Sequence, residues 1–334
     1  MAKFLIIRFS SIGDIVLTTP VIRCLRKKFP DAEIHFLTRN VYRGILSENP
    51  YLNKVHTLDH SFELMLHELK MEDYDHIIDL HHNLRTMRIK HFLKTVSPHS
   101  YNKLNVEKFI YTSLKINALP KKHIVDRYLE TVAGFGVVND GLGLDYFIPE
   151  TETVNQSDIP TSHLHGFIAI AIGAAHATKK LPLHKLKELC NIINHPIILL
   201  GGKEDFANGM EIAAADDIKV YNGCGKFNLN ESADLVRRAK LLISPDTGLM
   251  HIAAALQRPV ISIWGNTVPA FGMYPYYGKF SDQHFDTVEI HKLWCRPCSK
   301  IGYNKCPLGH FKCMELIPVQ SIADLVNARL RPHK

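Results

Sequence analysis

The sequence predicts an α/β protein built from two doubly wound units, each a parallel sheet covered by helices. Three observations favour this fold class. A length of 334 residues corresponds to about two domains at ~150 residues each. Short apolar runs alternate with helical patterns in both halves, which is typical of parallel sheets. A polar stretch without apolar periodicity, residues 149–166, separates the halves and is the best candidate linker.

In the first half, strands and helices are expected in turn. Apolar runs predict strands at residues 3–9, 32–37, 54–58 and 76–80. Helical spacing predicts helices at residues 20–29, 41–46 and 61–70, and the segment 84–135 reads as mostly helical. Thr19-Pro20 is a typical helix start, although Asp14 could instead cap an earlier turn.

The same alternation restarts after the linker. Strands are predicted at residues 167–172, 197–200, 219–221, 241–244 and 260–264. Helices are predicted at residues 183–193, 206–215, 230–239 and 248–256. Paired units of this kind bind ligands at the carboxyl ends of their strands, so the loops there are the first place to look for function.

Composition and charge exclude several classes of protein. Hydrophobic residues make up 46% and charged residues 22%, which argues against disorder, collagen and coiled coil as the global structure. The net charge of +7 favours acidic partners such as phosphates or an anionic membrane face. Lys and Arg are spread along the chain, so no nucleic-acid partner is expected. We expect no transmembrane helix and no signal peptide, and hence a cytoplasmic location.

Familiar nucleotide and metal motifs are missing from the sequence. There is no G-x-G-x-x-G after the first predicted strand, no P-loop and no H-E-x-x-H, so dehydrogenase, P-loop and zinc-protease functions lose support. Asp73-Tyr74-Asp75 has the D-x-D pattern of some metal-dependent glycosyltransferases, but its place just before a strand is more typical of a solvated turn.

The loop after the first strand, residues 8–20, carries the first candidate site. Ser10, Ser11 and Gly13 allow close backbone approach by a ligand. Asp14 would then be a carboxylate at the cleft, a candidate general base for a hydroxyl nucleophile. A helix cap is an equally good interpretation of Asp14.

Three loops of the second half carry further candidates. In residues 244–251, a helix start with Gly248 can bind phosphate, Asp246 can orient a sugar hydroxyl or cap the helix, and His251 can face the ligand or pack. Lys179 and Lys180 form a phosphate clamp or a solvated charge pair. Glu204 and Asp205 could bind ribose hydroxyls or complement a helix start.

Together these loops resemble the heptosyltransferase family of bacterial lipopolysaccharide core synthesis, glycosyltransferase family 9. The resemblance runs from residue 3 to about 265 and is carried by S-x-x-G-D-x-[VL]-x-T-T-P at residues 10–20 and S-x-D-T-G-x-x-H at residues 244–251. It implies a GT-B fold, two Rossmann-like domains facing a central cleft. It also implies inverting transfer of heptose from ADP-heptose to a sugar hydroxyl of the lipopolysaccharide inner core, with no cofactor required for catalysis.

The resemblance also implies roles for individual residues. Asp14 matches the general base, Lys179 the lysine at the donor pyrophosphate, and Phe227 the apolar residue against adenine. The implied ribose-binding acid is Glu204 or Asp205, and the implied donor turn consists of Asp246, Thr247, Gly248, Leu249 and His251. Ala174-Ala175 replaces the Thr-Thr of lipid A-proximal members, which leaves open a same-fold glycosyltransferase or epimerase that uses another nucleotide sugar.

The acceptor is expected on the first domain. The implied acceptor-binding residues are Ser11, Gly13, His81, Asn83, Arg85 and Arg88, with a polar helix start as the alternative for those after the fourth strand. We expect an acceptor-binding domain at residues 1–155, an ADP-sugar-binding domain at 156–318, and a C-terminal helix within 319–334 that packs back on the first domain. The implied acceptor is a lipid-linked core oligosaccharide, with peripheral contact at the cytoplasmic face of the inner membrane.

Four of the seven cysteines cluster in segment 295–313. Cys295, Cys298, Cys306 and Cys313, with His310 among them, could hold a structural zinc, although the spacing is not that of a standard ribbon or finger. Free thiols or redox pairs, and disulfides, are the open alternatives. A zinc-stabilised nucleic-acid-binding protein is the remote alternative function that this cluster suggests.

Overall fold

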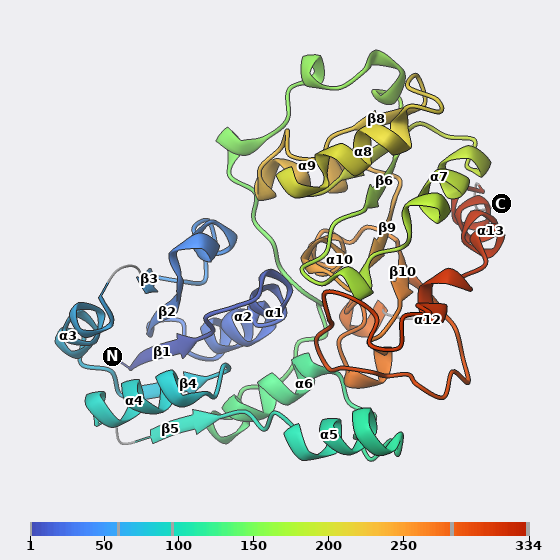
Figure 1. Ribbon diagram of the computed structural model, residues 1–334. Coiled ribbons are helices and arrows are strands. Elements are labelled where there is room, and N and C mark those ends of the chain that lie inside the picture. The colour runs from blue at the N-terminus through green and yellow to red at the C-terminus, as the bar shows by residue number, and fades with distance from the viewer. Residues whose placement is uncertain (1, 59–60, 95–96, 281–283, 332–334) are drawn as a thin grey trace. The chain divides into compact units, whose positions relative to one another are not determined.

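The computed structural model describes residues 2–58, 61–94, 97–280 and 284–331, and divides into two compact units (Figure 1). Unit 1 comprises Met1–Leu104 and Lys122–Phe147, and unit 2 comprises Asn105–Lys121 and Ile148–Lys334. Each unit contains one parallel sheet with helices between its strands, as the alternation in the sequence predicts.

Unit 1 is built on a sheet with the strand order β3-β2-β1-β4-β5. Its strands are β1 (Lys3–Ile7), β2 (Glu33–Arg39), β3 (Lys54–Leu58), β4 (His76–Asp79) and β5 (Ser97–Ser100). Its helices are α1 (Ile12–Val16), α2 (Thr19–Lys28), α3 (Phe62–Met71), α4 (Leu84–Leu93) and α6 (Ile124–Leu129), with 3-10 turns η1 (Asn40–Ile45) and η2 (Glu130–Phe135). The central strand β1 is a continuous apolar run because both of its faces are buried.

Unit 2 has a sheet with the order β11-β10-β9-β6-β7-β8. Its strands are β6 (Ile168–Ala171), β7 (Ile197–Leu200), β8 (Val220–Asn222), β9 (Leu241–Pro245), β10 (Val260–Trp264) and β11 (Phe285–Glu289). Its helices are α5 (Asn105–Leu114), α7 (Leu183–Ile192), α8 (Phe206–Ala213), α9 (Leu229–Arg238), α10 (Gly248–Ala255), α12 (Lys312–Glu315) and α13 (Val319–Leu330). Its 3-10 turns are η3 (Glu150–Glu152), η4 (Gln156–Asp158), η5 (Thr161–His163), η6 (Ala177–Lys179), η7 (Lys203–Asp205), η8 (Pro269–Phe271) and η9 (Gly278–Phe280).

Two strands lie where the sequence predicts none. β5 falls inside the segment 84–135 that reads as helical, and Pro98 within it is tolerated because β5 is an edge strand. β11 is an edge strand of the other sheet, with the partly polar sequence FDTVE. These two edge strands lack the apolar run of a central strand, and therefore the pattern that predicts strands does not detect them.

Residues 105–121 belong to unit 2, although the sequence places them in the first domain. The ring of Tyr111 in α5 packs edge-on against Phe271 with centroids 5.9 Å apart. Lys115 Nζ donates to the carbonyl of Pro297 at 2.8 Å. The division between the units also falls at 147/148 instead of at 155/156.

The C-terminal helix α13 buries its apolar face within unit 2. Ile322, Ala323 and Val326 are part of the unit 2 core, and α13 contacts α7 and β10. The expected packing of this helix on the first domain stays a prediction. Within the described ranges, no helix combines the length and the apolar character needed to span a membrane.

Candidate active site

Both sheets reverse their strand order at one point, and the loops that carry Asp14, His81, Lys179 and Asp246 follow the strands at that point. In unit 1 the reversal lies between β1 and β4, and in unit 2 it lies between β6 and β9. Ligands of doubly wound sheets bind at such switch points, just beyond the carboxyl ends of the strands. Each unit therefore offers one candidate site.

Asp14 is the centre of the unit 1 site. The backbone N–H and the hydroxyl of Ser11 donate to Asp14 Oδ2 at 3.1 and 3.0 Å. The other oxygen, Oδ1, lies 2.8 Å from Arg8 Nη2, and the side chain keeps 18% of its surface exposed. Asp14 thus stabilises the first turn of α1 and also remains reachable, so the two interpretations of this residue are compatible.

The surroundings of Asp14 keep its carboxylate ionised. Burial alone would raise the pKa of Asp14, but the charge of Arg8 and the Ser11 hydrogen bonds outweigh burial. The pKa consequently lies below its ordinary value. The group is a weak base that is always in its basic form at neutral pH.

Arg8 joins the two loops of the unit 1 switch point, and sequence reasoning did not select it as a site residue. Its guanidinium is buried and donates to the carbonyl of Leu80 at 2.6 Å and to the carbonyl of Ser10 at 2.7 Å. Arg8 also lies 5.9 Å from the centroid of the Tyr128 ring. A charged residue immediately after an apolar central strand was the available signal, because such a charge needs a partner.

The residues after β4 have mixed roles. His81 is half-buried with its ring edge-on to Phe9 at 5.2 Å, and burial together with the charge of Arg8 lowers the pKa of His81 to about 4. Asn83 is the N-cap of α4 and accepts from the backbone N–H of Thr86 at 3.0 Å, as the helix-start alternative predicts.

Of the other predicted acceptor residues, three are exposed to solvent and one is a buried glycine. Arg85 and Arg88 are exposed on α4, and the Arg88 guanidinium lies 4.8 Å above the ring of Phe62. Ser11 is exposed, and Gly13 is buried in α1.

The unit 2 site joins three loops through one carboxylate. Lys179 Nζ lies 2.6 Å from Asp246 Oδ2, and the hydroxyl of Thr267 donates to the same oxygen at 3.0 Å. These residues follow β6, β9 and β10 respectively. Sequence reasoning selected Lys179 and Asp246 separately, without predicting their contact, and it did not select Thr267.

The predicted donor turn starts helix α10. Thr247 is extended, with φ −140° and ψ 174°, and its hydroxyl lies 3.1 Å from that of Ser244. The first turn of α10 begins at Gly248 and Leu249, both half-buried, so its free N–H groups lie beside the Lys179–Asp246 pair. His251 is buried at 2% exposure, inside α10.

The two acids after β7 differ in their surroundings. Asp205 is buried, pairs with Lys180 at 2.6 Å and accepts from the backbone N–H of Gly202 at 3.1 Å. A Cβ at Gly173 would lie 2.3 Å from Asp205 Oδ2, so this loop requires glycine there. Glu204 is exposed and is the freer of the two predicted ribose-binding acids.

Phe227 follows β8, the edge strand next to β7 in the unit 2 sheet. It is half-buried after β8, and a Cβ at Gly223 would come within 3.3 Å of its ring. The glycine therefore lets the ring lie close to the carboxyl end of the sheet. This is the edge at which an adenine would be expected.

The structure does not support the zinc site predicted for the four-cysteine segment. Cys295, Cys298, Cys306 and Cys313 are free thiols in the part of the chain that is described. The group of candidate metal ligands whose atoms all lie close together there is His35, His56 and Glu72, and it includes no cysteine. Burial, with the neighbouring thiols, raises the pKa of Cys298 to about 11, so this thiol stays protonated.

The same segment contacts the loops that carry Lys179 and Thr267. Thr178, next to Lys179, donates its backbone N–H to the carbonyl of Tyr303 at 3.1 Å. Arg296 Nη2 donates to the carbonyl of Thr267 at 2.9 Å. The first contact holds the loop of Lys179 and the second holds the loop of Thr267, the two partners of Asp246.

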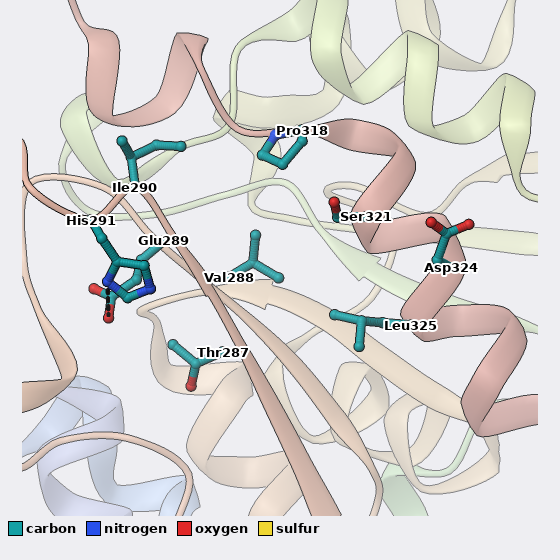
Figure 2. A pocket seen from close by; sticks show the side chains of 9 residues that line it. All are labelled: Thr287, Val288, Glu289, Ile290, His291, Pro318, Ser321, Asp324 and Leu325. Atoms are coloured by element: carbon teal, nitrogen blue, oxygen red, sulfur yellow. Dashed lines mark ion pairs between the residues drawn. The ribbon is translucent and has the colours of Figure 1, made fainter.

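A separate hollow of about 500 Å³ lies at the outer edge of the unit 2 sheet. Figure 2 shows Thr287 and Val288 from β11 facing Ser321 and Leu325 from α13 across it. It is lined by none of the predicted site residues.

Comparison with known proteins gives the family. The model of glycosyltransferase family 9 (heptosyltransferase) matches residues 64–301. The chain is 27% identical over 294 residues to lipooligosaccharide heptosyltransferase 2 of Haemophilus influenzae, covering 80% of this chain and 85% of that protein. It is 26% identical over 337 residues to lipopolysaccharide heptosyltransferase 3 of Escherichia coli, covering 93% of each.

Solved structures agree on the fold. A glycosyl transferase family 9 protein from Veillonella parvula superposes with a TM-score of 0.77 at 21% identity, covering 98% of this chain and 97% of that one. The E. coli heptosyltransferase WaaC with ADP superposes with a TM-score of 0.71 at 20% identity, covering 98% and 99%. With the family model spanning most of the sequence and both Rossmann-like sheets in place, this chain belongs to glycosyltransferase family 9, the heptosyltransferases, and is a glycosyltransferase of GT-B fold.

Proposed function

We propose that this enzyme transfers heptose from ADP-heptose to a sugar hydroxyl of the lipopolysaccharide inner core, with inversion at the anomeric carbon. The observation that carries the proposal is a cation–carboxylate pair at each switch point, Arg8–Asp14 in unit 1 and Lys179–Asp246 in unit 2. One pair supplies a base for the acceptor and the other supplies positive charge for the donor diphosphate. The relatives named above are lipopolysaccharide and lipooligosaccharide heptosyltransferases, which supports this substrate class.

The donor side follows from charge. When the sugar leaves, negative charge grows on the diphosphate, and preorganised donors lower the barrier. Lys179 can turn its ammonium from Asp246 to a phosphate oxygen, and the N–H groups at the start of α10 can bind the same anion. Asp246 then remains held by Thr267 and is free to accept from a sugar hydroxyl. Glu204 and Phe227 are the proposed ribose and adenine contacts.

The acceptor side follows from Asp14. The acceptor oxygen forms a new bond to the anomeric carbon from the face opposite the diphosphate, and the old carbon–oxygen bond breaks with its electrons going to ADP. The acceptor proton passes to the carboxylate of Asp14. Because Arg8 holds the pKa of Asp14 low, Asp14 is a weak base. The proton therefore transfers late, after the new bond to the anomeric carbon has begun to form and has made the acceptor hydroxyl acidic.

We infer that the enzyme binds its lipid-linked acceptor at a membrane surface. Segment 105–121 exposes apolar side chains of Val106, Phe109 and Ile116, each with at least 60% of its surface accessible. Lys115 and Lys121 are exposed in the same segment. Apolar side chains with flanking lysines favour peripheral binding to anionic lipid, here the cytoplasmic face of the inner membrane.

The test is transfer by the purified full chain to a truncated lipopolysaccharide core, measured by mass spectrometry of the product. ADP-heptose is compared with ADP-, UDP- and GDP-hexoses at equal concentration, because Ala174 and Ala175 lack the hydroxyls of the family pattern. Product from ADP-heptose alone supports the proposal. Product only from another nucleotide sugar, or epimerisation of the donor without transfer, would contradict it.

A further inference from the structure

A cluster of polar side chains lies in unit 1 at the amino ends of the strands, away from the loop of Asp14. His35 in β2 and His56 in β3 point to the same face of the sheet, since His56 is in register with Leu37. Glu72 and Tyr74 join them from the connection between α3 and β4. Both histidines are buried, with 4% and 6% of their surfaces exposed.

The atoms of this cluster are spaced as metal ligands are. His56 Nε2 lies 3.2 Å from His35 Nδ1, and the carboxylate oxygens of Glu72 lie 3.9 Å from His35 Nδ1 and 3.7 Å from His56 Nε2. Ligands about 2.1 Å from a tetrahedral ion lie about 3.4 Å from one another. We propose that His35, His56 and Glu72 bind a divalent transition-metal ion of the zinc type.

The chemistry of the donor set agrees with the spacing. Two imidazoles and one carboxylate suit Zn²⁺ and its transition-metal neighbours, whereas Mg²⁺ and Ca²⁺ prefer oxygen alone. Both imidazoles are buried, and the ring nitrogens that face each other, His35 Nδ1 and His56 Nε2, are the atoms placed to bind the ion.

Tyr74 orients the two rings. Its hydroxyl lies 2.9 Å from His35 Nδ1 and 3.0 Å from His56 Nε2. Burial raises the pKa of Tyr74 far above physiological pH, so it acts as a neutral hydrogen-bonding group. With an ion present, this hydroxyl is placed to be a fourth, weak ligand or to hydrogen-bond Glu72.

Two lysines compete with the ion for Glu72. Lys3 Nζ and Lys54 Nζ lie 2.6 and 2.5 Å from its two oxygens. Lys54 has 54% of its side chain exposed and Lys3 has 19%, so Lys54 is the ammonium that can swing into solvent. Its release frees Glu72 Oε1, the oxygen that faces His56.

The bound ion would be a structural brace. It would connect β2 to the edge strand β3 and to the end of α3, adding to the backbone pairing, the Lys54–Glu72 ion pair and the Tyr74 hydrogen bonds that already link these elements. None of the residues proposed to act in transfer takes part. The proposed metal site can therefore be tested independently of the proposed function.

The experiment titrates the full chain with Co²⁺ and Zn²⁺, following cobalt absorption and competition by zinc. A Cys298→Ser, Cys306→Ser background removes the two cysteines that are not buried, whose thiols are the most accessible competing ligands. We expect one ion per chain, a cobalt spectrum of nitrogen and oxygen ligands, and at least about tenfold weaker binding in His56→Gln. His67→Gln, an exposed histidine on α3, is the matched control and should bind as the background does.

Lys54→Gln provides a second test at an exposed position that should not affect folding. Removing its ammonium frees Glu72, so binding should become several-fold tighter, an effect that a purely structural role for the cluster would not produce. The proposal is overturned if the background binds no ion, if His56→Gln binds as tightly as the background, or if Lys54→Gln leaves the affinity unchanged. Binding that is lost only with the cysteines, with a thiolate-to-cobalt band in the unsubstituted chain, would also overturn it.

Discussion

Units 1 and 2 each have a cation–carboxylate pair at the switch point, but the exposed partner differs. In unit 1 the arginine is the more buried partner, with 9% of the Arg8 side chain exposed against 18% for Asp14. In unit 2 the carboxylate is the more buried partner, with 11% for Asp246 against 16% for Lys179. In each pair, the buried partner positions the exposed one. The same ion pair can thus present a base in one unit and a cation in the other.

The type of cation in each pair fits the difference in which partner is exposed. Arg8 is permanently charged and has a planar fork, so it can hold Asp14 and two carbonyl groups in one geometry. Lys179 has a flexible stem and a point charge, which lets it move from Asp246 to a ligand phosphate. The variants below separate the two pairs, from the largest expected effect to the smallest.

Asp14→Asn should reduce kcat by about 10²–10⁴, the usual contribution of a general base, and leave ADP affinity unchanged. Steady-state transfer and calorimetric ADP titration measure the two quantities. Asp31→Asn, at an exposed aspartate of the same unit, is the control and should behave as the unsubstituted enzyme does. A loss of ADP binding in Asp14→Asn would mean that the unit 1 pair serves the donor as well.

Lys179→Met should weaken ADP binding about thirtyfold or more, because truncating one member of a hydrogen-bonded charge pair costs ~2–5 kcal/mol. Calorimetry with ADP measures the change. Lys187→Met is the matched control, since the Lys187–Glu211 pair is on the surface and contributes little. An unchanged ADP affinity with a lowered kcat would instead place Lys179 in the chemical step alone.

Arg8→Gln should move the acidic limb of the kcat/KM profile to higher pH by about 1–3 units, because Arg8 opposes the effect of burial on the pKa of Asp14. The native pair stabilises the fold above the unfolded-state pKa of aspartate, and this stabilisation is lost as pH falls through the lower folded-state pKa. Arg8→Lys should shift the limb less. An unshifted limb in Arg8→Gln would show that another group sets it.

Thr267→Val should have the smallest effect, about fivefold weaker ADP binding, because it removes one hydrogen bond of ~1 kcal/mol to Asp246. The same calorimetric titration applies. Thr153→Val, which removes a surface hydroxyl bonded to the Glu150 carbonyl, is the control. A fall as large as that of Lys179→Met would make Thr267 a direct ligand contact.

Most of the fold could be predicted from the sequence, because buried central strands such as β1 and β9 are continuous apolar runs. The edge strands β5 and β11 could not, since half of each is polar or solvent-facing. The membership of α5 in unit 2 depends on contacts such as Tyr111 with Phe271, 160 residues away in sequence, and no local pattern encodes them.

The candidate site shows the same division. Asp14, Lys179 and Asp246 were predicted because they follow strands in a recognisable order. Their partners Arg8 and Thr267 were missed, because partnership is decided by which loops meet, not by spacing. The cysteines show a different limit, because thiols that are close in the sequence come near one another without forming a group of metal ligands among the described residues.

The contacts of the cysteine-containing segment have a practical consequence. Tyr303 and Arg296 hold the backbone on either side of the donor turn from outside it. If the nucleotide binds as proposed, changes in this segment would alter its affinity without changing any residue that is proposed to contact it. Substitutions in residues 296–303 are therefore a way to change donor affinity from outside the proposed donor site.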